Sequence, residues 1–469
     1  MRTETTEMIN IINPTIDLFL YDLRNSLGDD KKDIDQKRQY FYQKFHENVQ
    51  KQLKQDGKDN HQKHNLEVEY IPLLKEKIAY LEPNNPQENG YYYPVRLGDS
   101  YGLLLEVAAS EEKTPEYFSE LKQKIEQKLG KNTAILGKTW MLSTYLPNFS
   151  ETTPEEIEKI AKECYKAIFP NTKKIEFDSQ GKFIGATIFE YSDNSFKQEI
   201  VKLGNQETVN VFHTQHIIIA IYPDQETFDK LGELYTDWMR LLYYHHKIIW
   251  AYGQSRILIN KIKEKFSEIY TITESIEENI TQENAKVNKL QKMSKVLNQI
   301  QVIINKYTGN LNNLKLQQRT IDINLINYDK RLETFTNNAI NKVVNHETNI
   351  SFLEKFSKLV KEKYFLQIEK DLESFELGLR LLEDNINAIR SQTEIEKTQS
   401  DRNFQELIAV VGTGIAVAGL TGDNAAAECK SMFGPKFSLC QNTLAYHLIL
   451  VLTASVLTWL FRKYILKRS

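Results

Sequence analysis

The feature that most constrains the fold is a stretch of more than two hundred residues without proline, between Pro223 and Pro435. Before the last sixty residues, glycine occurs in it only at Gly232, Gly253, Gly309 and Gly378. Because proline and glycine are the two residues that most disfavour helix interiors, this region predicts long helices. We assign 223–405 to a helical stalk, with a turn at Tyr307–Asn310 and a second break at Asn345–Asn349.

Apolar residues near the end of the stalk alternate in steps of three and four: Phe365, Ile368, Leu372, Phe375, Leu379, Leu382, Ile386 and Ile389. Such a seam is typical of a coiled coil, and we expect one helix from about Ser351 to Leu420. In the same register the seam then becomes polar at Glu396 and Asn403. Either the helix end frays, or the assembly widens into a wet vestibule, where Glu396 and Asn403 line a pore and concentrate cations.

Two uncharged apolar runs lie near the end of the chain, at Leu407–Leu420 and Leu444–Phe461. About twenty apolar residues are needed for a helix to cross a bilayer. We therefore predict a two-span transmembrane hairpin over 406–469, with spans at about 404–421 and 444–462. A buried hairpin in a soluble domain is the alternative.

The charges around these runs predict an orientation. Arg462, Lys463, Lys467 and Arg468 follow the second run, and basic residues favour the cytoplasmic side of a membrane. The first residues are polar and lack the apolar core of a signal peptide. Both observations place the N- and C-termini in the cytoplasm and the protein in the cell's inner (plasma) membrane, in contact with membrane lipid.

Small residues recur at helical spacing in the first run, at Gly412, Ala416 and Gly419. They permit close helix packing in lipid, and they are equally candidates for lining a narrow pore. The loop between the runs contains Cys429 and Cys440. In an oxidising compartment they are a possible disulfide, and otherwise they are two free thiols.

The first part of the chain, 1–222, has the pattern of a cytosolic α/β domain. Strand-like runs at 66–71, 103–108, 139–146, 183–191 and 209–222 alternate with helical patterns at 115–129 and 154–168. Helices are expected before the sheet, at Glu7–Leu27 and Lys31–Gln55. The predicted fold class is thus an α/β domain, a coiled-coil stalk and a transmembrane hairpin.

Composition and motifs offer no catalytic chemistry, so we expect a protein that is not an enzyme and has no cofactor. The net charge of −3 gives no reason to expect nucleic-acid binding. The segment Gly130–Thr139 lacks the glycine spacing of a phosphate-binding loop and leads into a strand. Cys164 is expected to be a buried apolar residue.

The histidines also give no metal-ligand pattern. His213 and His216 are three apart in a probable strand, which places them on opposite faces of the sheet. His245 and His246 are neighbours on a helix, and we expect their side chains to diverge.

The order of these regions resembles the CorA-type magnesium transporter superfamily. That family has a Gly-Met-Asn motif at the outer end of its first span, and Gly422-Asp423-Asn424 occupies the corresponding position in this chain. The glycine and the asparagine match, whereas Asp423 adds a carboxylate. The loop carrying the cysteines is longer than is usual in the family, and the first span is short.

The resemblance implies a homo-oligomeric channel or transporter for divalent cations, gated by its cytosolic domain. The expected assembly is a pentamer, with Gly422, Asp423 and Asn424 at the pore entrance and Mg²⁺ as transported or regulatory ion. The alternative is a membrane-anchored sensor or defence effector, a degenerate CorA-like protein whose cytosolic domain responds to a ligand. A purely structural coiled-coil anchor is a third interpretation.

Overall fold

The computed structural model describes most of the chain from Asn10 to Lys397. The described ranges are 10–26, 28–56, 70–82, 90–130, 133–172, 175–203, 208–282, 286–342 and 347–397. These residues form two compact units. The first comprises Met1–Gln254 and Gln318–Leu366, and the second Ser255–Gln317 and Gln367–Ser469.

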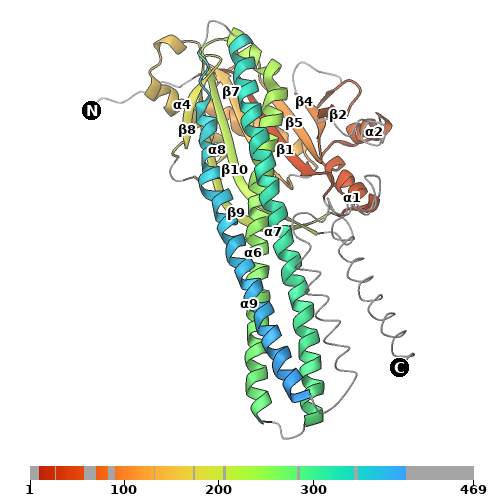
Figure 1. Ribbon diagram of the computed structural model, residues 1–469. Helices are drawn as coiled ribbons and strands as arrows, with labels where there is room; N and C mark the ends of the chain where they lie inside the picture. The colour runs from red at the N-terminus through yellow and green to blue at the C-terminus, as the bar shows by residue number, and fades with distance from the viewer. Residues whose placement is uncertain are drawn as a thin grey trace. The chain divides into compact units, whose positions relative to one another are not determined.

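The first unit is built on one mixed sheet of ten strands, in the order β2-β4-β5-β1-β7-β10-β9-β8, with β3 paired to β4 and β6 to β1 (Figure 1). Neighbouring strands are antiparallel, except that β7 and β10 are parallel. The strands are β1 (Ile11–Leu23), β2 (Tyr70–Pro72), β3 (Ala79–Tyr80), β4 (Tyr91–Leu97), β5 (Ser100–Ala108), β6 (Glu112–Lys113), β7 (Gly137–Tyr145), β8 (Ser179–Phe183), β9 (Ala186–Lys202) and β10 (Thr208–Tyr222).

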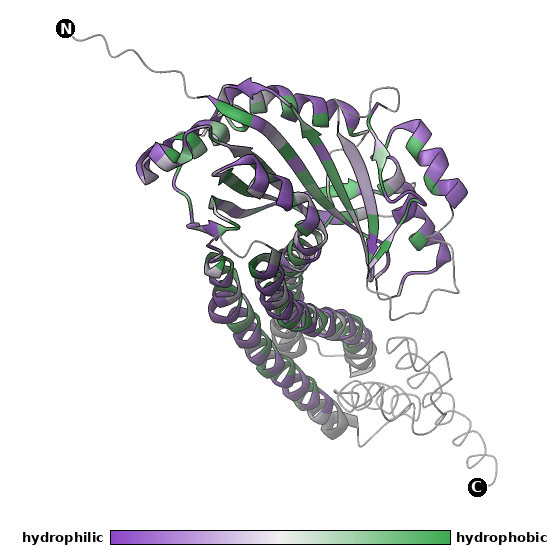
Figure 2. Cartoon of the chain, turned by 90° about the horizontal axis from the view of Figure 1, so that it is seen from above, coloured by the Kyte–Doolittle hydropathy of each residue, from purple (hydrophilic) through white to green (hydrophobic). Residues whose placement is uncertain are grey.

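One face of the sheet carries the main hydrophobic core of this unit. Four helices cover it: α1 (Lys31–Tyr42), α2 (Glu47–Asp56), α3 (Phe118–Lys128) and α4 (Pro154–Ile168). Leu18 and Leu20 of β1 point into this core, together with Leu103 and Leu105 of β5. Side chains alternate between the two faces of a strand, so Asp17, one residue before Leu18, lies on the other face. Figure 2 shows the strands coloured largely as hydrophobic, and the helices as alternately hydrophobic and hydrophilic.

The other face of the sheet is covered by the beginning of α6 (Tyr235–Gln282). The Tyr21 hydroxyl of β1 donates to the Met239 carbonyl over 2.9 Å, and the ring of Phe19 packs edge-on against Tyr235 at 6.3 Å. The short helices α5 (Gln225–Asp229) and η3 (Lys230–Leu234) connect β10 to α6. Leu18 and Leu20 on one side, and Phe19 and Tyr21 on the other, are fully buried. Strand β1 is therefore enclosed on both faces.

The second unit consists of helical segments. It takes the later part of α6, the first part of α7 (Lys286–Lys342) and most of α9 (Leu366–Lys397). Arg256 pairs with Asp371 at 2.9 Å, Lys315 pairs with Glu376 at 2.8 Å, and the Tyr307 hydroxyl donates to the Phe375 carbonyl. The most deeply buried seam positions of α9 are Ile368, Leu372, Leu382, Ile386 and Ile389.

Between α7 and α9 the backbone changes its helical form. The predicted break at Asn345–Asn349 is confirmed, because α7 ends at Lys342 and a new turn, η4 (Ser351–Leu353), begins after it. Helix α8 (Glu354–Leu359) then passes into a π-helical segment at Val360–Phe365. In that segment the Tyr364 ring stacks on Tyr252 with centroids 4.1 Å apart.

The predicted fold class is wrong. The described residues contain one large, mostly antiparallel sheet in place of an alternating α/β domain. They also contain no helix with the length and apolar character needed to cross a bilayer. The predicted hairpin at 406–469 lies outside the described residues.

Two local predictions are also wrong. Glu7–Leu27 was expected to be a helix, but Ile11–Leu23 is the central strand β1, whose apolar residues serve two faces and therefore lack a one-sided pattern. The turn expected at Tyr307–Asn310 lies inside α7. A single glycine with helix-forming neighbours lowers helix stability by only about 1 kcal/mol, which long-helix packing readily offsets.

A pair of glycine substitutions tests these two helices. A Cβ on Gly253 of α6 would lie 2.5 Å from ring atoms of Phe212 on β10, whereas a Cβ on Gly309 of α7 would have no heavy atom within 4 Å. We expect Gly253→Ala to lower the free energy of unfolding by about 1–3 kcal/mol through overpacking. We expect Gly309→Ala to raise it by up to about 1 kcal/mol. Denaturant unfolding measures both, and destabilisation by Gly309→Ala would contradict the continuous α7.

Candidate functional site

A cavity of about 620 Å³ opens beside the start of α6, and its wall carries a carboxyl group from the sheet. Strands β4 and β5 contribute Tyr91 and Glu106, and α6 contributes Tyr235. We call this cavity, with these three residues and Asp17 behind them, the acidic pocket. All of it belongs to the first unit.

The sheet register places the two carboxyl groups of the acidic pocket opposite one another. Asp17 of β1 pairs directly with Glu106 of β5 in the antiparallel ladder. Directly opposed side chains on one face have Cβ atoms only about 4.5–5.5 Å apart. The Tyr235 hydroxyl donates to Asp17 Oδ2 over 3.1 Å, and the Tyr91 hydroxyl donates to Glu106 Oε2 over 2.9 Å. The other oxygen of Asp17, Oδ1, is buried and has no hydrogen-bond partner among the described residues.

Burial governs the protonation of this pair. Desolvation raises the pKa of Asp17 well above its usual range, the negative charge of Glu106 raises it further, and the Tyr235 hydroxyl acts in the opposite direction. Desolvation also raises the pKa of Glu106, against the hydrogen bonds from Tyr91 and Tyr235. Two close carboxyl groups in such a site favour sharing a proton over carrying two negative charges.

The two tyrosines remain hydrogen-bond donors in the pocket. Burial raises the pKa of both hydroxyls, and the neighbouring carboxylates raise it further. A neutral phenol next to a carboxylate donates its only proton to it. Tyr91 and Tyr235 therefore hold the carboxyl groups in place but do not neutralise them.

A second buried polar cluster lies under α6, where three histidines meet. His216 of β10 stacks on His245 with ring centroids 4.3 Å apart, and the rings of His245 and His246 are 5.0 Å apart. The Thr139 hydroxyl of β7 lies 2.7 Å from both His216 Nδ1 and His246 Nε2. His216 Nε2 faces Glu190 Oε1 of β9 at 3.1 Å.

The hydrogen bonds assign one consistent set of tautomers to this histidine cluster. If Glu190 is ionised, His216 donates from Nε2 and accepts the Thr139 proton at Nδ1, and Thr139 then accepts from His246 Nε2. His246 Nδ1 is left with a lone pair, in agreement with its being buried and without a hydrogen-bond partner. Burial lowers the pKa of His245 and His246 well below the usual value, so both are neutral. The described residues contain no group of three or more His, Cys, Asp or Glu side chains arranged to hold a metal ion.

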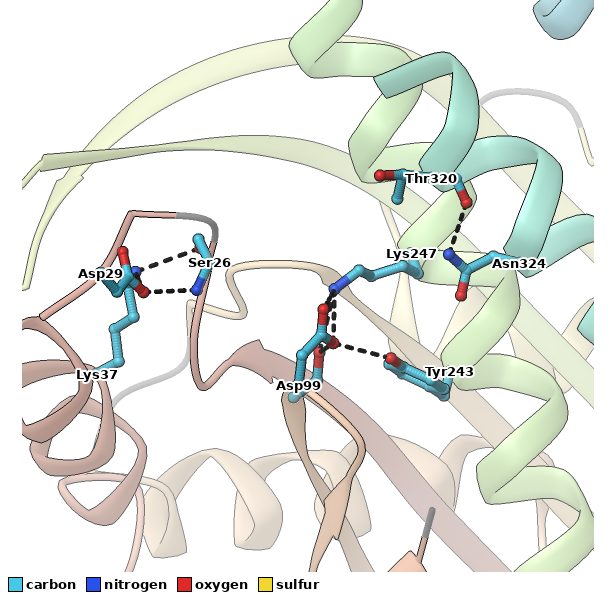
Figure 3. A network of polar contacts seen from close by, with 9 residues as sticks. Ser26, Asp29, Lys37, Asp99, Tyr243, Lys247, Thr320 and Asn324 are labelled. Carbon is cyan, nitrogen blue, oxygen red and sulfur yellow. Dashed lines mark hydrogen bonds and ion pairs between the residues drawn. The ribbon is translucent and has the colours of Figure 1, made fainter. Parts of the chain in front are cut away.

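A third polar contact under α6 is an ion pair with the turn between β4 and β5. Lys247 Nζ lies 2.7 Å from both carboxylate oxygens of Asp99, and the Tyr243 hydroxyl donates to Asp99 Oδ1 over 3.0 Å (Figure 3). Burial disfavours ionisation of Asp99, but the Lys247 charge and the hydroxyls of Ser100 and Tyr243 outweigh it and lower its pKa. In contrast to the acidic pocket, this carboxylate has its own counter-ion.

The structure brings together residues that the sequence analysis kept apart. His216, His245 and His246 share one cluster, so the expected divergence of His245 and His246 is wrong. His213 is exposed and bonds to Glu199 instead. Asp17 and Glu106 were missed, although a single acidic residue inside an otherwise apolar strand signals them in both TIDLFL and LLLEVA. Cys164 is buried in the core, which confirms its prediction.

The predicted pore residues are not placed by this structure. Glu396 falls within α9, but its side chain is not among those described. The remaining candidates lie outside the described residues: Asn403, Gly412, Ala416, Gly419, Gly422, Asp423, Asn424, Cys429 and Cys440.

Comparisons with known proteins give little further information. No protein-family model matches the chain, and no curated protein sequence matches it. Among solved structures it is similar to the complete structure of the CorA magnesium transporter from Methanocaldococcus jannaschii, at 15% identity over 71% of this chain and 90% of that chain. The TM-score is 0.17, and a similarity of that size carries no inference about shared fold or function.

The opposite electrostatics of Asp17 and Asp99 predict opposite effects of removing each charge. An aspartate with a raised pKa in the folded state costs stability progressively as the pH rises above its unfolded value of about 3.9. Asp17→Asn removes that cost. We therefore expect its melting temperature relative to the wild-type protein to increase from pH 5 to pH 8.

Asp99→Asn is the matched control. A carboxyl group whose pKa is lowered in the folded state stabilises the protein fully at every pH above its unfolded pKa. The variant Asp99→Asn therefore lacks the same amount of stability at every pH between 5 and 8. We expect a deficit of about 1–3 kcal/mol, because Lys247 loses a charged hydrogen-bond partner. Thermal unfolding of both variants at pH 5.0, 6.5 and 8.0 measures the two profiles. A flat difference for Asp17→Asn would contradict the uncompensated pair.

Proposed function

We propose that the protein is a ligand-gated membrane protein of CorA-like function: its sheet domain binds a small molecule in the acidic pocket and thereby controls the passage of divalent cations, magnesium among them. The observation that carries the sensing part is the carboxyl pair without a counter-ion at the cavity, with Glu106 in the wall and Asp17 behind it. The proposal assigns no catalytic reaction to the chain.

The buried carboxyl pair lowers the stability of the folded protein, because it has no counter-ion. A destabilising pair of this kind at a cavity supports a role in binding. Asp22, on the same strand as Asp17, is also buried, but Lys44 lies 3.3 Å from it. Asp17 and Glu106 form no salt bridge with any described residue. Ionisable groups with strongly perturbed pKa values in a cavity are typical of functional sites. A positively charged ligand at Glu106 would recover part of the cost.

The position of Tyr235 gives a physical route from the pocket to the rest of the chain. It is the first residue of α6, it contacts both carboxyl groups, and it lines the cavity. A ligand that displaces its hydroxyl from Asp17 acts directly on the beginning of this helix. Switching by a shift of one packed element is a common mode of regulation.

The membrane part of the proposal is supported by the sequence. Two uncharged apolar runs, Leu407–Leu420 and Leu444–Phe461, favour location in the plasma membrane with both termini cytoplasmic. The triplet Gly422–Asn424 between them supplies amide and carboxylate oxygens, which suit a hydrated Mg²⁺ ion. Conduction along an axis requires a homo-oligomer, and we propose a pentamer.

The second candidate function is a membrane-anchored sensor or defence effector that conducts no ions. The acidic pocket supports it equally, because sensing does not depend on what the signal controls. Ion flux distinguishes the two candidates.

The pocket can be narrowed without altering its carboxyl groups. Gly232 of η3 lines the cavity, and a Cβ there would meet no heavy atom within 4 Å. We expect the small-molecule fraction of a cell extract to raise the melting temperature of the wild-type protein and of Gly232→Ala, and to raise that of Gly232→Phe less, because the added ring takes up part of the space at the cavity wall. An equal shift in all three proteins would show that the pocket is not the binding site.

Reconstituted protein tests conduction. We expect vesicles containing the full chain and a magnesium-sensitive dye to show flux, and Asn424→Ala to remove most of it. Thr443→Ala, at the other end of the same loop, is the control and should retain flux. Flux no greater than in empty vesicles, beside a working transporter, would exclude conduction and leave the sensor.

A further inference from the structure

The chemistry of the acidic pocket also indicates what kind of molecule it binds. Its wall contains five aromatic side chains: Tyr80, Tyr91, Tyr117, Phe228 and Tyr235. Aromatic faces attract cations, most strongly when the site excludes water. The pocket already shows one such contact, because Lys113 Nζ lies over the Tyr117 ring at 5.2 Å from its centroid.

The charges around the cavity favour a positive ligand. Its wall contains three acidic side chains, Glu106, Glu111 and Asp229, and two basic ones, Lys113 and Lys124. The Lys113 ammonium is bonded to Glu111 Oε2 over 2.7 Å, so its charge is already balanced at the rim. Asp17 behind the wall adds a further carboxyl group. The deep part of the pocket is thus acidic, and an anionic ligand would be repelled there.

A metal ion fits the same residues poorly. Magnesium and calcium bind oxygen lone pairs from several ligands at once. The phenols of Tyr91 and Tyr235 occupy one oxygen of each carboxyl group as donors. Among the described residues, no cluster has the three or more ligands that a metal site needs. A group with its own N–H donors fits better, because the Glu106 carboxyl group in the wall has no cationic partner among the described residues.

We infer that the acidic pocket binds an organic cation, in which a protonated amine or guanidinium group contacts Glu106, with the charge of Asp17 behind it, and an apolar body packs on the aromatic wall. This inference rests on the proposed ligand-binding function and specifies its ligand class. The cavity of about 620 Å³ is within the size range of small-molecule sites, so the ligand is larger than the amine group alone.

A cationic ligand and the carboxyl pair compete with protons. Binding of a positive charge favours the ionised pair, so protons are released and the affinity rises from pH 5 to pH 8. The other titratable and charged groups of the pocket are Tyr80 from β3, Tyr91 from β4, Glu111 and Lys113 from the β6 region, Tyr117 before α3, Lys124 from α3, Asp229 from α5 and Tyr235 from α6. A neutral ligand would not release protons.

Titration calorimetry on the full-length protein with four probes distinguishes a cationic ligand from a neutral one, an anionic one and a metal ion. The probes are phenethylammonium, the neutral 2-phenylethanol, the anionic 3-phenylpropionate and Mg²⁺. We expect saturable binding of phenethylammonium alone, with proton release that appears as different heats in buffers of different ionisation enthalpy.

Two glutamate variants locate the binding. Glu106→Gln should weaken phenethylammonium binding roughly tenfold to a hundredfold, because a charged hydrogen-bond partner is lost. Glu112→Gln, at an exposed residue beside the cavity that does not line it, is the matched control and should leave the affinity within about twofold, as is usual for an exposed charge. If Glu106→Gln does not fold, proton release and the pH dependence in the wild-type protein still decide the question.

Each other outcome overturns the inference. Equal or tighter binding of the alcohol or the carboxylate, weakened in Gly232→Phe, would retain the ligand pocket but reject a cationic ligand. Competition by Mg²⁺ at the same site would make it a metal site. Absence of binding by all four probes, together with no stabilisation by the cell extract, would reject the proposed pocket function as well.

Discussion

The packing of α6 on one face of the sheet is the constraint on which the rest of the first unit depends. This face carries Asp17, Glu106, Thr139, Glu190 and His216 among its apolar residues. When a helix covers such a face, every polar group beneath it needs a partner or destabilises the fold. The polar groups beneath α6 differ in their partners at three positions along the helix.

At two of the three positions the buried groups satisfy one another. Lys247 neutralises Asp99, and His216, Thr139 and His246 form a chain of hydrogen bonds that ends at Glu190. At the third position, next to the cavity, Asp17 and Glu106 face each other without a counter-ion. The contrast argues that the third position is kept for a ligand, because the same fold gives the buried Asp22 a lysine partner and the buried Glu190 a histidine partner.

Much of the local structure could be predicted from the sequence. The proline-free region forms long helices, and α4 spans Pro154–Ile168 as its helix-start residues indicate. Strands β5, β7 and β10 overlap the apolar runs that predicted them, and each begins one to three residues earlier. Strand β1 was mistaken for a helix because both of its faces are buried, and a segment with apolar residues on both sides shows no clear period. The sheet order, with β1 between β5 and β7, cannot be predicted from periodicity.

The amino-acid sequence by itself determined the helix α4 and the long helices after Pro223, and it shows which single polar residues interrupt the apolar strands, because these properties depend on near neighbours. Only the tertiary structure decided that Asp17 meets Glu106 and that His216 meets His245 and His246. Asp17 and Glu106 are 89 positions apart in the chain and His216 and His245 are 29 apart, so their meeting depends on strand register and on which face of the sheet α6 covers. Long-range packing sets the strand register and the face of the sheet that α6 covers. The acidic pocket therefore exists only once the sheet has formed and α6 has packed on it.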